Sequence, residues 1–255
     1  KLAETHLHNS ASEGIAFQKT AKQFGFHELD AGKIMGMASY GVEDPNLPEI
    51  YLNGKINKDL FTYKYSEHNE ILLNVKDFPY LDTDNFQIQA NFAKKLQEAT
   101  QHKVLIDILR IVEETGVKKV CLAGGFFLNC VANYYYKKHL PKDIELYIEP
   151  ISSDAGTSYG AAKLLWHSET KDTTIRPLES LYLGLQHKIS IKDLEHRTYK
   201  KVSSQDVAQL IADRNIVAMY QGRSEGGPRA LGNRSILYDP RDTQGKDKVN
   251  TVKKR

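Results

Sequence analysis

Two arginines stand in a glycine-rich stretch, EGGPRALGNRS, at residues 225–235. A proline fixes one backbone angle there, and the glycines permit turns that other residues resist, so the sequence predicts a stiff loop that presents Arg229 and Arg234. Guanidinium groups bind phosphate or carboxylate oxygens through paired hydrogen bonds. The residues leave two interpretations open: a loop that binds an anion, or a loop shaped by an arginine that pairs with Glu225 or Asp239.

A second glycine-marked turn, LAGGFFLN, occupies residues 122–129. Gly124 and Gly125 stand where a predicted strand turns into a helix. Paired glycines there let a ligand approach the backbone, and the following helix offers free N–H groups to an anion. The spacing matches neither the Walker nor the Rossmann pattern. A tight turn without a ligand is the alternative.

A third turn, SSDAGTSYGAA, follows the next predicted strand at residues 152–162. Asp154 is able to cap the helix that begins there. A carboxylate at the mouth of a parallel sheet can instead bind a metal ion that bridges phosphates. Two such turns at neighbouring strand ends favour a nucleotide without establishing one.

The elements that position these turns alternate between helices and strands, which favours an α/β fold with parallel pairing. Apolar periodicity predicts helices over 11–26, 30–41 and 84–116, with Gly41 as a left-handed cap, and an irregular region over 42–83. VKKVCLAGG at 117–125 is typical of a buried strand. The polar segment at 168–178 predicts a linker, so we expect one domain over 1–178 and the start of a second over 179–255.

The composition is that of an ordinary globular protein, with 255 residues, 40% hydrophobic and 26% charged. No apolar run is long enough for a membrane helix, and we expect no membrane partner. The net charge of +3 does not demand nucleic acid, and we expect none. Cys121 and Cys130 lack zinc-site spacing and predict buried free thiols, hence a cytoplasmic protein.

Four stretches together resemble the O-carbamoyltransferase family, which includes nodulation-factor, cephamycin and tobramycin enzymes. They occur in the family's order, and the last is the most specific: GKIMGMASYG, LAGGFFLNCVAN, SSDAGTSYGAA and SEGGPRALGNRSILYDPR. The resemblance covers nearly the whole chain. It identifies the chain as the central fragment of a longer enzyme.

The resemblance implies a transferase of two parts. The first is the C-terminal half of an actin and sugar-kinase-like (ASKHA) domain that binds nucleotide and metal, and the second is the start of a smaller α/β carbamoyl-activating (YrdC-like) domain. The implied reaction is ATP-dependent: carbamoyl phosphate gives carbamoyl-adenylate, whose carbamoyl group passes to a hydroxyl of a small molecule or glycan. The implied cofactors are ATP with Mg²⁺ and a divalent metal, iron in the family. A homodimer is compatible with this interpretation.

The resemblance also assigns residues. Gly124, Gly125 and Asn129 match the turn that contacts ATP or carbamoyl-adenylate. Asp154 matches a metal ligand. Three further residues match the nucleoside side of the site, namely Gly32, Lys33 and Gly36, and two match the carbamoyl phosphate site, namely Arg229 and Arg234. Catalytic residues are not assigned.

Some positions depart from the family. The chain lacks the family's H-x-x-x-H motif, and Gly226 stands in place of a usual phenylalanine. Two alternative functions therefore stay open. One is transfer of threonylcarbamoyl to tRNA. The stretch GPRALGNRS around Arg229 argues against it, because this stretch resembles the O-carbamoyltransferases. The other is a non-catalytic nucleotide-binding module.

Overall fold

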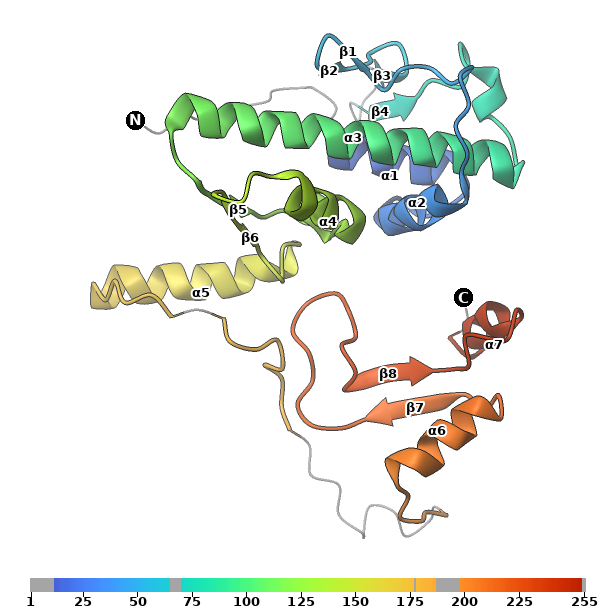
Figure 1. Ribbon diagram of the computed structural model, residues 1–255, viewed down its shortest axis with the longest axis vertical. Coiled ribbons are helices and arrows are strands. Elements are labelled where there is room, and N and C mark those ends of the chain that lie inside the picture. Colours follow the sequence, from blue (N-terminus) through green and yellow to red (C-terminus); the bar gives the residue numbers. More distant parts are fainter. Residues whose placement is uncertain (1–11, 65–69, 177, 187–197, 254–255) are drawn as a thin grey trace. The chain divides into compact units, whose positions relative to one another are not determined.

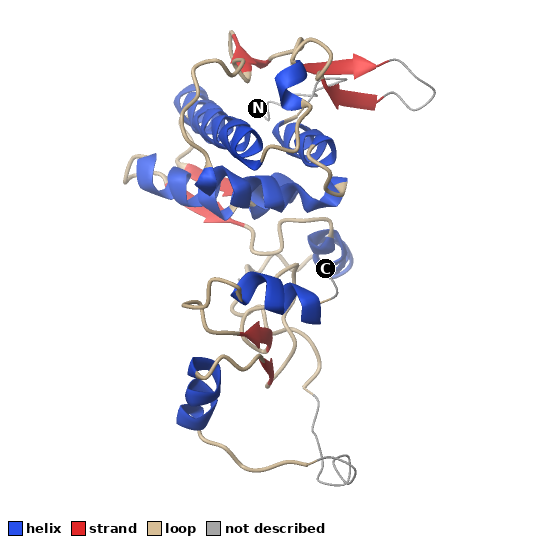
Figure 2. Cartoon of the chain, turned by 90° about the vertical axis from the view of Figure 1, so that its right-hand side faces the viewer, coloured by secondary structure: helices blue, strands red, loops and turns tan. Residues whose placement is uncertain are grey.

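The computed structural model describes residues 12–64, 70–176, 178–186 and 198–253. The chain divides into two compact units, unit 1 over Lys1–Asp154 and unit 2 over Ala155–Arg255. Each unit mixes helices with strands, which confirms the α/β class (Figures 1 and 2). No helix within the described ranges is long and apolar enough to cross a membrane.

A long helix, α3 (Phe86–Thr115, Figure 1), contributes side chains to two hydrophobic cores of unit 1. Asn85 caps its start, and Gly116 ends it in the left-handed conformation, with φ of 69°. The N-terminal half packs against α1 (Glu13–Gln23) and α2 (Ala31–Met37). The apolar residues of this first core include Ala16, Phe17, Ile34, Phe92 and Leu96. The predicted helix over 84–116 is therefore confirmed, and burial of its apolar side chains supplies most of its stability.

Two antiparallel hairpins occupy the region that the sequence predicts to be irregular. β1 (Tyr51–Leu52) pairs with β2 (Lys55–Ile56), and β3 (Phe61–Lys64) pairs with β4 (Glu70–Leu73). Asn53 and Gly54 close the first hairpin with φ values of 51° and 72°. Positive φ at both positions is why the turn uses an Asn-Gly pair.

The C-terminal half of α3 packs over a parallel pair, β5 (Lys119–Leu122) and β6 (Glu145–Ile148). A short 3₁₀ helix, η4 (Gly125–Leu128), and α4 (Cys130–His139) connect the strands. Parallel pairing is confirmed, but a fully buried strand is wrong. Alternate side chains of β5 face α3 and α4, whereas the others, including Cys121, are exposed. Cys130 is a free thiol and exposed too, so the prediction of buried thiols is wrong for both cysteines.

Gly41 ends the predicted helix over 30–41, which the structure resolves into α2 between two 3₁₀ turns, η1 (Glu28–Asp30) and η2 (Ala38–Tyr40). The predicted left-handed cap is wrong, because Gly41 has φ −77° and ψ 152°, an extended conformation. A different constraint explains the glycine. A Cβ at this position would stand 2.7 Å from the Cβ of Lys94 and closer still to the carbonyl oxygen of Ala90. The chain passes directly against α3 here.

Replacing Gly41 with alanine is therefore expected to destabilise unit 1 by about 1–3 kcal/mol, because the added methyl group must displace helix backbone. Urea unfolding measures this change. Gly14→Ala is the matched control, since a Cβ at Gly14 meets only the Ser12 hydroxyl, at 4.0 Å. Equal stability of Gly41→Ala and wild type would contradict the close approach.

Unit 2 contains helices α5 (Ala155–Thr170), α6 (Ser204–Ala212) and α7 (Gly245–Val252), and one antiparallel pair, β7 (Val217–Tyr220) with β8 (Arg234–Leu237). Ser203 and Asp206 form a reciprocal capping box at the start of α6. The pairing registers Val217 with Leu237 and Tyr220 with Arg234. The stretch with the two arginines is thus the connection of this hairpin and the start of its second strand.

Candidate functional site

The signature loop (residues 225–235) folds back on itself through the side chain of Glu225. One carboxylate oxygen, Oε1, accepts hydrogen bonds from the backbone N–H groups of Leu231, Asn233 and Arg234 at 2.9, 2.8 and 3.2 Å. These bonds, that of Leu231 foremost, lower the pKa of Glu225 below its usual value. The ionised carboxylate therefore joins the beginning of the loop to its end.

Arg234 lies half-buried against the same loop. Its Nη1 donates to the backbone carbonyls of Gln221 at 2.7 Å and Asn233 at 2.8 Å, and its guanidinium lies 3.8 Å from the ring centroid of Tyr220. Arg234 thus shapes the loop, as the second interpretation expects, but through main-chain carbonyl groups and not through Glu225 or Asp239. Its predicted contact with carbamoyl phosphate stays a prediction.

Arg229 lies at an exposed position in the middle of the loop, directly after Pro228. Among the described residues, its guanidinium has no hydrogen bond, ion pair or ring contact. A guanidinium carries five N–H donors in a planar fork. Arg229 therefore offers an unengaged cation on a loop whose other charged side chains are occupied.

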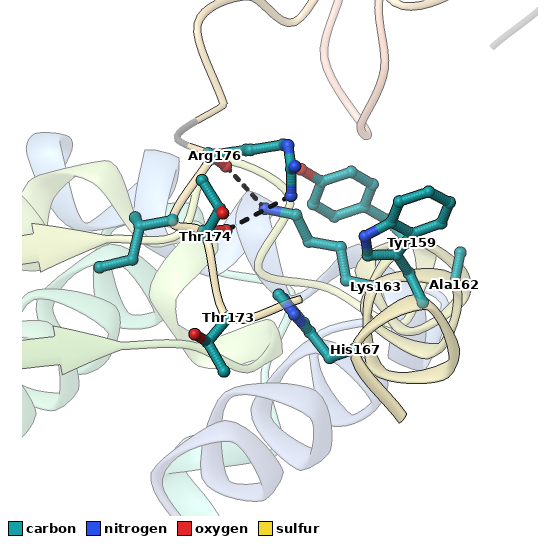
Figure 3. Close-up of a pocket in the computed structure, with 9 residues that line it drawn as sticks. Tyr159, Ala162, Lys163, His167, Thr173, Thr174 and Arg176 are labelled. Carbon is teal, nitrogen blue, oxygen red and sulfur yellow. Dashed lines mark hydrogen bonds between the residues drawn. The ribbon is translucent and has the colours of Figure 1, made fainter. Parts of the chain in front are cut away.

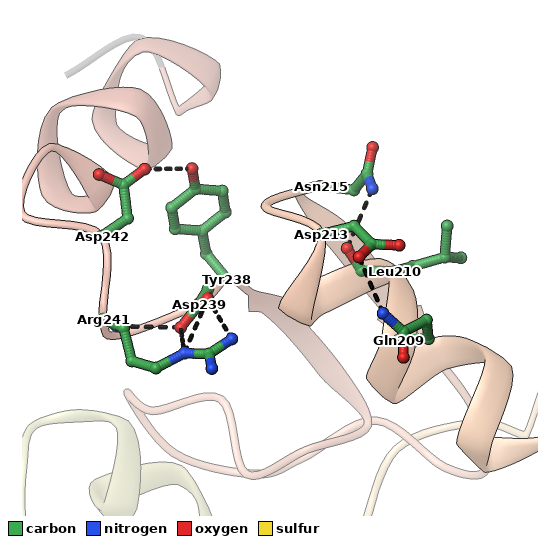
Figure 4. Close-up of polar contacts among 8 residues, drawn as sticks. All are labelled: Gln209, Leu210, Asp213, Asn215, Tyr238, Asp239, Arg241 and Asp242. Carbon is green, nitrogen blue, oxygen red and sulfur yellow. Dashed lines mark hydrogen bonds and ion pairs between the residues drawn. The ribbon is translucent and has the colours of Figure 1, made fainter.

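An ion pair between a buried carboxylate and an exposed guanidinium follows the loop, at the end of β8 (Figure 4). Asp239 is 4% exposed and accepts from Arg241 through Nε at 2.9 Å and Nη2 at 2.7 Å. The Arg241 guanidinium lowers the pKa of Asp239 to about 2. Next to it, Asp242 accepts from the Tyr238 hydroxyl at 2.6 Å and from Lys248 at 2.8 Å. These carboxylates fix the turn between β8 and α7.

Arg241→Ala is expected to lower the free energy of unfolding at neutral pH. The folded-state pKa of Asp239 lies below its usual value, so the pair stabilises the fold above about pH 4 and loses that contribution as the pH falls towards 2. The difference between wild type and variant should therefore shrink in acid. Urea unfolding at pH 7 and pH 3 measures it. A difference that is the same at both pH values would contradict the role of the ion pair.

The glycine turn of unit 1 has an open backbone. Gly124, directly before η4, has φ of 112°, a conformation that L residues rarely adopt. A Cβ built on Gly124 or on Gly125 would meet no atom within 4 Å. Close packing therefore does not explain the second glycine. The space beside it is free for a ligand to approach the main chain.

Asn129 faces the interior at the end of this turn. Its side chain is 9% exposed and caps α4 by accepting from the N–H of Ala132 at 3.0 Å. It also forms a reciprocal amide pair with Gln97 of α3, at 2.8 and 3.3 Å. The predicted contact of Asn129 with nucleotide stays a prediction. The amide pair anchors the glycine turn to α3.

The three residues predicted for the nucleoside side lie on α2. Lys33 pairs with Asp30 at 2.8 Å and lies 4.9 Å from the ring centroid of Phe26. Gly36 has free space where a Cβ would point. Gly32 precedes them on the same helix. Helix α1 packs against α2 and against η4, where Phe17 and Phe126 have ring centroids 6.2 Å apart.

Asp154 ends the turn after β6 and directly precedes α5. Two residues before it, Ser152 is 5% exposed, and its hydroxyl has no hydrogen-bond partner in the structure. Within the part of the chain that the structure describes, no three His, Cys, Asp or Glu side chains gather where they could hold a metal ion. Asp154 as a metal ligand therefore stays a prediction.

A cavity of about 520 Å³ lies in unit 2, and none of the predicted site residues lines it. It opens between α5, with Tyr159, Lys163 and Trp166, and the segment 173–176 (Figure 3). The Lys163 ammonium donates to the carbonyl oxygen of Arg176 at 2.9 Å. The lysine thus holds the segment in place.

Two family models of known proteins match two separate parts of the chain. Residues 1–163 match the family model of the carbamoyltransferase N-terminus, and residues 208–255 match that of the carbamoyltransferase C-terminus. The chain belongs to the carbamoyltransferase family. The predicted boundary after residue 178 lies between the two matched ranges, and the compact units divide after Asp154.

Three individual relatives match between 52% and 98% of the chain. It is 32% identical to an uncharacterized protein of Methanocaldococcus jannaschii, over 98% of the chain and 43% of the relative. It is 31% identical to a nodulation protein of Sinorhizobium fredii, over 96% of the chain and 38% of the relative. A 3′-hydroxymethylcephem-O-carbamoyltransferase of Amycolatopsis lactamdurans is 30% identical over 52% of the chain and 25% of its own length. The chain thus spans less than half the length of these relatives.

The structure adds residues that sequence reasoning missed. Gln97 lies within a long amphipathic helix, where nothing in the local pattern separates it from other polar positions. Arg241 carries a signal, because an Asp-Pro-Arg turn after a strand places a guanidinium beside a carboxylate. Glu225 appeared only as a potential partner of an arginine, and its partners are backbone N–H groups.

Proposed function

We propose that the protein carrying this chain transfers a carbamoyl group from carbamoyl phosphate, through a carbamoyl-adenylate, to a hydroxyl group of a small molecule or glycan. Membership of the carbamoyltransferase family supports the group that is transferred. The name of one relative, a 3′-hydroxymethylcephem-O-carbamoyltransferase, supports a hydroxyl acceptor. The observation that carries the proposal is the exposed, unengaged Arg229 on a loop held by its own backbone contacts.

In this proposal the signature loop binds the donor, carbamoyl phosphate. Negative charge on the phosphate oxygens of carbamoyl phosphate shifts as the carbamoyl group departs, and a cation already in place stabilises that charge without reorganising. Arg229 meets this requirement, because it has no protein partner to give up among the described residues. Arg234 is the weaker candidate, since its Nη1 is bound to carbonyl oxygens.

The glycine turn of unit 1 binds the nucleotide in this proposal. Free space beside Gly124 and Gly125 fits the approach of ATP or of the adenylate to the main chain. Lys33 supplies a positive charge on α2, where it pairs with the half-buried Asp30. ATP would bring Mg²⁺ with it and supply the adenylyl group. Water would release the phosphate of carbamoyl phosphate as inorganic phosphate, and the carbamate so formed would displace pyrophosphate from ATP to give the carbamoyl-adenylate.

The resemblance also implies a divalent metal for the transfer of the carbamoyl group. Asp154 would supply one carboxylate ligand, and the described residues of this chain do not gather the others. A metal site built from this chain's described residues is therefore not supported.

The test is release of pyrophosphate and AMP by the protein that carries this chain, measured with ATP in the presence and absence of carbamoyl phosphate. The proposal expects release that depends on carbamoyl phosphate. Binding of ATP without any release would favour a non-catalytic nucleotide module. Binding of tRNA that weakens steeply with salt, without release, would favour threonylcarbamoyl transfer.

A further inference from the structure

The two ionised side chains that flank Arg229 in the signature loop both bind main-chain groups, either of the loop itself or of Gln221 just before it. Glu225 collects three N–H groups on a single carboxylate oxygen, at 2.8 to 3.2 Å. Arg234 donates to two carbonyl groups, of Gln221 and Asn233, at 2.7 and 2.8 Å. An acid thus binds backbone donors and a base binds backbone acceptors, so the loop needs no ligand to satisfy either charge.

The contacts join residues far apart along the loop. Glu225 reaches across six positions to Leu231 and nine to Arg234, and thereby closes the segment that contains Pro228 and Arg229 into a ring. Two further contacts hold the ring from outside. The Tyr182 hydroxyl donates to the carbonyl of Leu231 at 3.0 Å, and the N–H of Gly226 donates to the carbonyl of Leu181 at 2.6 Å.

We propose that Glu225 is a positioning residue for the donor-binding arginine: its carboxylate closes the signature loop and thereby places Arg229 for the phosphate of carbamoyl phosphate. The inference deepens the proposed function and rests on it. It also assigns different roles to the two arginines of the loop. Arg234 shapes the loop, and Arg229 meets the donor.

All three N–H groups bind one oxygen of Glu225, so a substitution can remove the negative charge of this side chain and still leave the hydrogen-bond acceptor. In Glu225→Gln the amide oxygen keeps the acceptor that all three N–H groups use, although charge-assisted bonds become neutral ones and weaken. In Glu225→Ala the three N–H groups lose their acceptor altogether. Glu225→Gln should therefore retain much of the loop geometry, and Glu225→Ala should lose it.

The experiment combines kinetics with amide hydrogen exchange on the protein that carries this chain. Glu225→Ala should raise the KM for carbamoyl phosphate about 10- to 100-fold, the scale on which misplacing a binding group acts, and leave the KM for ATP unchanged. The peptide that covers 229–235 should exchange faster. Glu225→Gln should lie closer to wild type in both measurements. Glu169→Ala, an exposed acid of α5, is the matched control and should match wild type.

Two results would overturn the inference while leaving the proposed function intact. One is a Glu225→Ala variant whose carbamoyl phosphate KM equals that of an active wild type, even if its loop exchanges faster, because the carboxylate would then be structural only. The other is an equal rise in both KM values. A wild type without pyrophosphate release that depends on carbamoyl phosphate would refute the proposed function itself, and the inference with it.

Discussion

Replacing Arg229 with alanine is expected to lower kcat/KM for carbamoyl phosphate about 100- to 1,000-fold, the usual cost of removing one preorganised group that stabilises transition-state charge. Steady-state pyrophosphate release with saturating ATP measures it. The loss should come without a loss of stability, since the Arg229 side chain makes no hydrogen bond or ion pair within the described residues. Urea unfolding of the variant should therefore coincide with that of wild type.

Two further variants locate the effect of Arg229. Arg229→Lys keeps the charge but loses the planar fork, so its kcat/KM should lie between those of wild type and Arg229→Ala. Lys246→Ala removes an exposed cation from the same unit and should leave the rate unchanged. A wild-type rate in Arg229→Ala would show that the loop does not bind the donor.

The second large effect is expected at the glycine turn. Gly125→Ala should weaken ATP binding about 10- to 100-fold, because the new methyl group enters the open space through which a nucleotide approaches the main chain. The fold should tolerate it, since a Cβ at Gly125 meets no atom within 4 Å. Calorimetric titration with ATP measures the affinity, and urea unfolding measures the stability.

Gly124→Ala separates strain from obstruction at the same turn. Its φ of 112° makes any side chain strained whatever the space, so this variant should lose about 1–3 kcal/mol of stability as well as ATP affinity. Gly14→Ala, in α1, should change neither property greatly. ATP affinities equal to wild type in both turn variants would mean that the turn is structural and binds no nucleotide.

Local patterns were sufficient for much of the fold. The apolar stripe of α3 and its glycine end are confirmed, because both depend on residues close together in the sequence. Gly41 shows where such reasoning fails. A glycine after a helix suggests a left-handed cap, but this glycine exists because α3, some fifty residues later, passes against it. Only the tertiary contact distinguishes the two causes.

The candidate sites show the same limit. The density of glycine around Arg229 and Arg234 predicted a stiff loop, yet their residue type could not reveal that Arg234 binds the main chain while Arg229 does not. Asn129 was placed correctly in a turn, but its amide pair with Gln97 joins positions 32 residues apart. Cys121 was predicted to be buried from an apolar run, whereas one face of the two-stranded sheet is exposed.

The formation of carbamoyl-AMP tests the central proposal most directly. The protein that carries this chain is incubated with ¹³C-labelled carbamoyl phosphate and ATP, without acceptor, and the quenched mixture is analysed by mass spectrometry. We expect a labelled carbamoyl-adenylate, strongly reduced in Arg229→Ala and in Gly125→Ala. Turnover of both substrates without a labelled adenylate, or equal amounts of adenylate from wild type and both variants, would contradict the assignment of these two turns to donor and nucleotide.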